Sequence, residues 1–278
     1  MEMAGVDLLL TGAGYSPATV ETAMWRLGER SVDVETVTLA EEVPVALVYN
    51  GRSHAVVMST PLDLEDLAAG FSVTEGIVDD ASELERVDVV RASHGIEVQI
   101  QIPTSRRERL SERSRTLMAR TACGLCGIET INDAMRIPER VVHSLDISRD
   151  ALFLAAHDLG ARQTINNETS TVHAAAWANQ FGEIQLVRED VGRHNALDKL
   201  FGAMLRTSTP VRHGFVVITS RASYEMVQKA AVCGVEILAA VSRPTGLAVR
   251  FAQQTGVTLV ALLRGRTANV YASPQRIS

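Results

Sequence analysis

The chain has 278 residues, 46% of them hydrophobic, which is enough for one large domain or two ordinary ones with a substantial core. Its net charge of −6 argues against a general nucleic-acid-binding protein. No apolar run reaches the roughly 18 residues of a membrane-spanning helix. Three cysteines are too few for a disulfide framework, and the acidic N-terminus differs from a signal peptide, so we expect a soluble, cytoplasmic protein.

The first part of the chain is predicted to form a short segment and a small domain. Residues 1–30 are expected to be a poorly ordered N-terminal segment, because Gly, Thr and Ser are frequent near its start. Residues 31–104 are predicted to form a small α+β subdomain. Its clearest signal is Asn50-Gly51, which lies between two apolar runs and predicts a β-hairpin. A helix that opens at Thr60-Pro61 and two strands around His94-Gly95 complete this unit.

Residues 105–130 are predicted to be a charged tether followed by a mobile loop. The loop holds two of the three cysteines, Cys123 and Cys126, in the sequence Cys-Gly-Leu-Cys-Gly. Glycines lower the cost of large backbone changes. The arginines upstream favour the thiolate, which is the reactive form of cysteine. The pattern therefore predicts sulfur chemistry at Cys123 and Cys126.

Three kinds of site remain open for this cysteine pair on the residues alone. It could be half of a zinc site, but a second cysteine pair is missing, and His143 or His173 would have to complete it. It could be a thioredoxin-type dithiol, but a charged segment precedes it where a strand is expected. It could carry a persulfide in a mobile loop, with one thiol taking up sulfane sulfur and the other assisting. The third cysteine, Cys233, lies on an apolar helix and is predicted to be a buried small side chain.

Residues 131–278 are predicted to form the second domain. Apolar strands alternate there with helices of about 10–13 residues, which is typical of a layered and partly parallel α/β sheet. Together with the first unit, the predicted fold class is α/β (α+β). The predicted strands are 172–178, 183–187, 215–219, 237–241, 258–263 and 269–272, and the predicted helices after Val172 are 196–205, 224–232 and 246–254.

Three strand-to-helix junctions of this domain carry an arginine beside a small or hydroxyl residue. Helix N-termini and arginine forks both favour anions, and ligands of parallel sheets bind at the carboxyl ends of the strands. A phosphate-bearing ligand, such as a pyrophosphate, is therefore predicted at this edge, although Asn195 and Ser223 could equally be plain helix caps. The charge density of residues 188–199 favours a ligand-binding function. The candidate residues are Arg193 and His194, then Ser220 and Arg221, then Arg243.

A fourth candidate is the loop that follows the apolar strand 258–263. It reads Leu262-Leu263-Arg264-Gly265-Arg266-Thr267. One interpretation is a basic hairpin turn with no further function. The other is a ligand-binding loop, in which Gly265 permits close approach and the two arginines meet negative charge.

Three of these segments together resemble the FdhD family of formate dehydrogenase accessory sulfurtransferases. They are residues 123–127, 188–199 and 219–226, and the resemblance extends over roughly residues 34–277. It implies a cytidine-deaminase-like fold for the C-terminal domain and a homodimer. It also implies a protein that takes sulfur from a cysteine desulfurase as a persulfide. The sulfur then passes to the molybdenum or tungsten bis(molybdopterin guanine dinucleotide) cofactor that formate dehydrogenase needs.

The resemblance also implies roles for particular residues. By motif position it places the persulfide on Cys123, its companion on Cys126 and a cofactor-binding loop on residues 262–267. GDP is then expected to mimic part of the cofactor, and no permanently bound metal, nucleic acid or membrane partner is expected. A non-catalytic chaperone that binds the cofactor remains an alternative. A zinc-dependent deaminase is disfavoured, because the strand that begins at His173 lacks the proton-transferring glutamate of that site.

Overall fold

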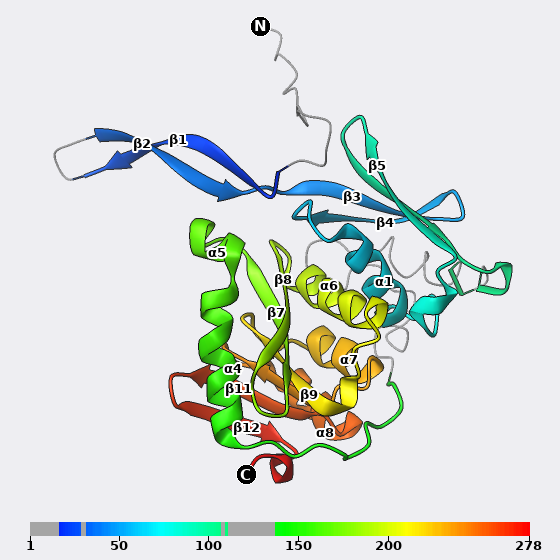
Figure 1. The fold of residues 1–278 in the computed structure, drawn as a ribbon, viewed down its shortest axis with the longest axis vertical. Helices are drawn as coiled ribbons and strands as arrows, with labels where there is room; N and C mark the ends of the chain where they lie inside the picture. Colours follow the sequence, from blue (N-terminus) through cyan, green and yellow to red (C-terminus); the bar gives the residue numbers. More distant parts are fainter. Residues whose placement is uncertain (1–16, 29–31, 107–108, 111–136) are drawn as a thin grey trace, which may run out of the picture.

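The computed structural model describes residues 17–28, 32–106, 109–110 and 137–278. Within these ranges the strands form three sheets, of two, four and six strands (Figure 1). No helix in the described ranges is long and apolar enough to cross a membrane. The predicted site residues from position 173 onward all lie in the described part of the chain.

The smallest sheet is an antiparallel hairpin of β1 (Thr19–Leu27) and β2 (Val32–Ala40), with Thr19 opposite Ala40. It extends away from the rest of the described chain in Figure 1. The segment expected to be poorly ordered therefore includes a strand, while residues 1–16 lie outside the described residues. Val, Thr and Trp favour extended backbone, and pairing with β2 gives β1 hydrogen-bonding partners that local composition does not reveal.

The second sheet has the order β4-β3-β6-β5, and α1 (Leu64–Thr74) packs against one face. The hairpin predicted at Asn50-Gly51 is confirmed, because both residues have the positive φ angles, 48° and 76°, that favour Asn and Gly. α1 begins after the predicted Thr60-Pro61, because Asp63 takes a left-handed conformation before it. The strands are β3 (Val43–Tyr49), β4 (Arg52–Ser59), β5 (Arg86–Ala92) and β6 (Gly95–Gln101).

The largest sheet has the order β12-β11-β10-β9-β7-β8. β9, β10 and β11 are parallel, whereas β7, β8 and β12 pair antiparallel with their neighbours. The predicted fold class, with a mixed and partly parallel sheet, is therefore confirmed. The strands are β7 (His173–Asn179), β8 (Ile184–Asp190), β9 (Gly214–Ile218), β10 (Ile237–Ala240), β11 (Thr258–Arg264) and β12 (Thr267–Ala272).

Helices cover both faces of this sheet. α6 (Arg193–Arg206), α7 (Tyr224–Val232) and α8 (Gly246–Thr255) pack on one face, and α4 (Arg149–Arg162) packs on the other. Because neighbouring residues of a strand point to opposite faces, Val216 packs toward α6–α8 while Val217 packs toward α4. The remaining short helices are α5 (Thr164–Thr169), η1 (Ala81–Glu83), η2 (Thr104–Arg106), η3 (Val211–His213) and η4 (Pro274–Arg276).

The four-stranded unit is joined to the six-stranded domain where α1 crosses α6. The two helix backbones approach closely: a Cβ on Gly70 would lie 1.8 Å from the carbonyl oxygen of Asp198, and one on Gly202 would lie 1.8 Å from that of Asp66. Only glycine fits at such positions. The two units therefore pack directly against each other at this crossing.

Buried ion pairs reinforce this contact. Lys199 Nζ lies 2.6 Å from Asp190 Oδ2 and also donates to the carbonyl oxygen of Thr60, at 2.9 Å. Lys229 Nζ lies 2.9 Å from Asp198 Oδ2 and 3.0 Å from Glu75 Oε1. These are the only two lysines in the sequence, and both side chains are almost fully buried. On the described surface, arginine is therefore the residue that supplies permanent positive charge, because neither lysine is exposed.

Candidate functional site

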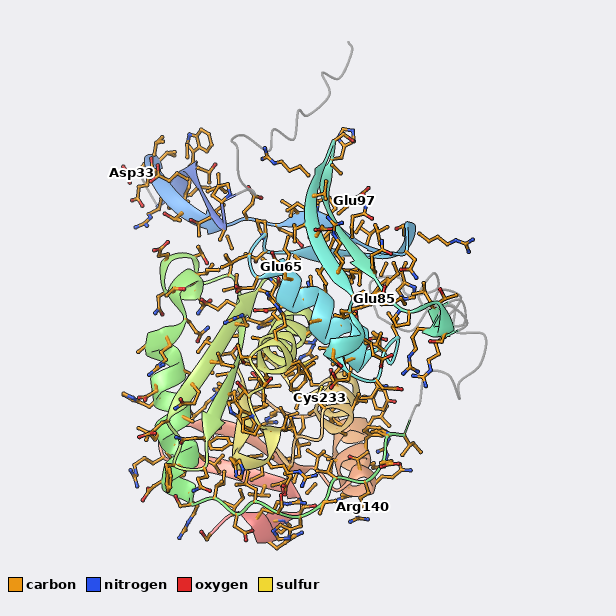
Figure 2. The ribbon with its side chains drawn as sticks, turned by 45° about the vertical axis from the view of Figure 1, so that its right-hand side comes forward. Asp33, Glu65, Glu85, Glu97, Arg140 and Cys233 are labelled. Carbon is orange, nitrogen blue, oxygen red and sulfur yellow. The ribbon has the colours of Figure 1, made fainter. Side chains whose placement is uncertain are left out.

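Of the three cysteines, only Cys233 lies among the residues that the structure describes. Cys123 and Cys126 lie outside the described residues, so their reactivity stays a prediction. Cys233 follows α7 and is half-buried rather than fully buried as predicted; it packs against the apolar clusters of both larger sheets, in the region where α7 faces α1 (Figure 2). Burial, with a further contribution from the charge of Asp198, raises the pKa of the Cys233 thiol well above its usual range. Its thiolate is therefore scarce at neutral pH.

This difference predicts unequal labelling of the thiols. In the folded protein, a maleimide should modify Cys123 and Cys126 at least roughly tenfold faster than Cys233, because the thiolate is the reacting form. The measurement is a time course of labelling followed by peptide mass spectrometry. A sample unfolded in guanidinium serves as the control, since all three thiols should react alike there. Equal rates in the folded protein would contradict the assignment.

The predicted junctions of the second domain do lie at one edge of the six-stranded sheet. The isolated bridge between Ala222 and Pro244 joins the loops that follow β9 and β10. The Leu262 N–H lies 3.3 Å from the carbonyl oxygen of Ser242, which joins the β10 loop to β11. β7 runs antiparallel to β9, so its first residue, His173, is at the same edge. We call this region the carboxyl edge.

The starts of α6 and α7 lie side by side at the carboxyl edge. His194 Nε2 lies 2.6 Å from Glu225 Oε2, which links the first turn of α6 to that of α7. The residues at the N-cap positions, Gly192 and Ser223, make no side-chain capping bond. The N-cap residues themselves therefore leave the starts of α6 and α7 without a side-chain cap, and a helix N-terminus with its dipole favours an anion.

The charges at this edge favour a negative ligand and keep one histidine neutral. Arg221, Arg243 and Arg264 are exposed there, although the whole chain is acidic. Burial lowers the pKa of His173, and the nearby Arg193 and His194 lower it further, while Asp190 acts in the opposite direction. His173 is therefore an uncharged imidazole at neutral pH.

The candidate residues are not equally accessible. Arg221 is exposed, but Ser220 is 4% exposed and its hydroxyl donates to the carbonyl oxygen of Arg221 at 3.2 Å. In the 262–267 loop, Leu263 is a core residue that packs toward α4. Leu262 has a positive φ of 55° where the pairing of β11 with β12 becomes irregular. The exposed residues of the loop are Arg264, Gly265, Arg266 and Thr267.

Arg266 of this loop already has partners on α4. Its Nη2 lies 2.7 Å from Asp150 Oδ1, and its guanidinium lies 5.6 Å from the centre of the Phe153 ring. Both charged side chains of the pair are largely exposed, so solvent screens the attraction. Arg266 therefore holds the loop against α4 only weakly.

The charge density of residues 188–199, which favoured ligand binding, is mostly structural. Asp190 Oδ2 accepts from Ser59 Oγ at 2.6 Å and from the Thr60 N–H at 3.1 Å, as well as from Lys199. Asn195 is not the cap of α6, because Gly192 is at the N-cap position; the Asn195 Nδ2 instead donates to the carbonyl oxygen of Met58 at 2.7 Å. These groups connect β4 to α6. In this block, Arg193 and His194 are the residues placed toward the carboxyl edge.

Sequence reasoning missed three residues of the edge. Glu225 and Ser223 were not predicted as ligand-binding residues, and His173 was considered only as a zinc ligand. The signal for Glu225 and Ser223 was their place at the start of the helix after β9, with Ser223 at the N-cap and Glu225 in the first turn. His173 had no such signal, because its position depends on the antiparallel pairing of β7.

In the described part of the chain, no group of three or more His, Cys, Asp and Glu side chains is arranged to hold a metal ion.

Comparison with known proteins gives consistent matches. The model of the FdhD/NarQ family matches residues 40–278. The sulfur carrier protein FdhD of Cupriavidus necator is 48% identical over 260 residues, covering 94% of this chain and 90% of that protein. That of Xanthomonas euvesicatoria is 49% identical over 260 residues, covering 94% and 92%. The crystal structure of a putative formate dehydrogenase accessory protein from Desulfotalea psychrophila shares the fold, with a TM-score of 0.74, 23% identity, and coverage of 94% and 100%.

Proposed function

The chain belongs to the FdhD/NarQ family, and from this membership we propose that it is a sulfur carrier that serves formate dehydrogenase. In this proposal it acts as a sulfurtransferase in the cytoplasm, as a homodimer. Cys123 takes up sulfur from a cysteine desulfurase. The carboxyl edge holds the acceptor, the bis(molybdopterin guanine dinucleotide) cofactor with its molybdenum or tungsten.

The observation that carries the proposal is the convergence of arginines and two helix N-termini at one sheet edge. A dinucleotide cofactor presents pyrophosphate groups, which need positive charge and N–H donors. Arg193 comes from α6, Arg221 from the loop after β9, and Arg264 from β11. The edge therefore has the chemistry that the phosphates of such a substrate require.

The sulfur steps can be written with balanced bonds and electrons. The Cys123 thiolate attacks the terminal sulfur of the desulfurase persulfide. A new S–S bond forms on Cys123, and the old one breaks to leave the desulfurase thiolate. Release of that sulfur as sulfide needs two electrons. Cys126 supplies them by attacking Cys123 Sγ, which forms a Cys123–Cys126 disulfide that a cellular dithiol must then reduce.

The test of the loading step is the intact mass of the protein after incubation with a desulfurase and cysteine. The wild-type protein should gain the mass of one sulfur atom, and a reductant should remove it. Cys123→Ala should gain none. The Cys233→Ala variant is the control and should load normally, because the Cys233 thiol packs against apolar side chains and has a raised pKa. A Cys123→Ala protein that still gains the sulfur would overturn the assignment.

GDP should bind to the carboxyl edge as a mimic of one half of the cofactor. The affinity should fall as salt rises, for example from about 50 to about 300 mM, because ions screen the attraction between the phosphates and the arginines. Titration calorimetry at the two salt concentrations measures this. Guanosine is the control, since it has no phosphate and its binding should not depend on salt. An absence of GDP binding at millimolar concentrations would count against this edge as the cofactor site.

A further inference from the structure

The hairpin of β1 and β2 carries an apolar patch near its tip. In the register of the two strands, Trp25 is opposite Val34 and Leu27 is opposite Val32. Residues directly opposite each other share a face of a sheet, as do residues two apart in one strand, so these four side chains lie together. Each of them is between 64% and 78% exposed. We call Trp25, Leu27, Val32 and Val34 the tip patch.

The hairpin alone gives no reason for the tip patch. An isolated two-stranded sheet is marginally stable in water at best, because it has no core in which to bury apolar side chains. With the usual areas of such side chains, the tip patch exposes on the order of 500 Å² of apolar surface. An apolar patch of this size is commonly a functional surface. We therefore expect another molecule to contact it.

The size of the tip patch favours a transient partner over a permanent one. A stable complex buries about 800 Å² on each side, whereas weak and transient encounters bury less than about 1,200 Å² on both sides together. A contact centred on the tip patch belongs to the second class. A protein that receives a cofactor and then leaves needs a contact of this reversible kind.

The hairpin lies at the end of the molecule that holds the carboxyl edge. Glu189, near the end of β8, accepts from the N–H groups of Ile165 and Asn166 and so fixes the start of α5 there. β2 in turn contacts α5. Figure 1 shows the hairpin passing over α5, and Figure 2, where Asp33 is labelled, shows it projecting from the same end of the molecule. A partner bound to the tip patch is therefore held close to the proposed cofactor site.

The charges of the hairpin indicate the chemistry of that partner. Among the charged side chains of the described β1 and β2 strands, Glu21 alone shares the face of the tip patch. The ion pair of Arg26 with Glu35, at 2.8 Å, lies on the opposite face. A face with an acid and no basic side chain does not attract an anionic membrane. It is complementary to a protein surface that is apolar at its centre and basic beside it.

We propose that the tip patch is the docking surface for formate dehydrogenase, the client that receives the sulfurated cofactor. Trp25 and Leu27 supply the apolar anchors, and Glu21 attracts a basic side chain of the client. The proposal rests on the proposed function for the identity of the client, and it adds the place where that client binds. No covalent step takes place at the hairpin.

The test measures binding of the protein to formate dehydrogenase purified from a strain that lacks this protein, by biolayer interferometry. Trp25→Ser combined with Leu27→Ser should weaken binding about tenfold or more, because a few buried aromatic and apolar anchors carry most of the energy of an interface. Glu21→Lys should slow association, since charges at the rim act mainly on the association rate. The matched control is Phe181→Ser. Phe181 is 67% exposed in the turn after β7, at the opposite edge of the six-stranded sheet, and its loss should not affect binding.

The outcomes separate docking from folding, from assembly and from sulfur loading. The melting temperature of the double variant should match that of the wild type, because both side chains are exposed. Unchanged affinity in the double variant and in Glu21→Lys would overturn the proposal, as would a wild-type protein that does not bind the dehydrogenase. A smaller oligomer of the double variant in sedimentation would assign the patch to contacts between copies of this chain and would overturn it too.

Sulfur loading on Cys123, measured by intact mass, should be the same in the double variant as in the wild type. Loss of loading in the double variant alone would assign the tip patch to the desulfurase and overturn the docking of the client. Loss of loading in the wild type would instead contradict the proposed function, whatever the hairpin binds.

Discussion

Formate dehydrogenase activity should fall to background in cells whose only copy of this protein carries Cys123→Ala. In the proposed mechanism Cys123 is the atom that carries sulfur, and alanine has no nucleophile to replace it. The measurement is formate dehydrogenase activity in extracts of a deletion strain that expresses the variant, with the level of the variant checked by immunoblot. This substitution should affect activity more than any other single change proposed for the chain.

The matched control is Cys233→Ala in the same strain. It makes the same Cys-to-Ala change, but at a thiol whose pKa is raised and which packs against apolar side chains. Maturation of formate dehydrogenase should therefore continue. The comparison also separates the two leading functions. A chaperone that only binds and delivers the cofactor would not need Cys123. Normal activity with Cys123→Ala would therefore favour the chaperone and reject the sulfur carrier.

The pattern of strands and helices in the second domain was predictable because each element carries local signals. Helix α7 starts and ends at the predicted residues, Tyr224 and Val232. Its neighbour α8 begins at the predicted Gly246, after Thr245, whose side chain accepts from the Ala248 N–H. The common edge also followed from general rules, since the carboxyl ends of parallel strands meet at one side of a sheet.

Long-range partners were not predictable, and they decide what a charged residue does. Asp190 and Lys199 are nine residues apart and look like part of a ligand loop. Asp190 accepts from Ser59 and Thr60, and Lys199 donates to Thr60, and these partners are more than a hundred residues away in the sequence. The position of His173 likewise depends on which strand β7 pairs with. A single sequence does not reveal such pairings, so it could not separate edge residues from interface residues.

The Lys229→Met variant should lose about 3–5 kcal/mol of stability at neutral pH, the cost of removing one partner from a buried ion pair. Lys229 Nζ contacts Asp198, Glu75 and the Thr74 hydroxyl, at 2.9 to 3.0 Å. Methionine has nearly the same shape but leaves the carboxylates without a counter-charge. Guanidinium unfolding of the two proteins at the same pH measures the difference. The control is Arg266→Gln, whose exposed ion pair should contribute little.

The stability that Lys229→Met loses should increase as the pH rises. Burial already raises the pKa of Asp198 above 3.8, and removal of the ammonium group should raise it further. A carboxyl with a raised pKa in the folded state is destabilising once it ionises, so the defect should grow as the pH rises and shrink toward about pH 5. Asp198→Asn in the Lys229→Met background should restore part of the stability. A loss that is small and independent of pH would mean that the apolar contacts and the close packing of α1 on α6 hold the two units together without this network.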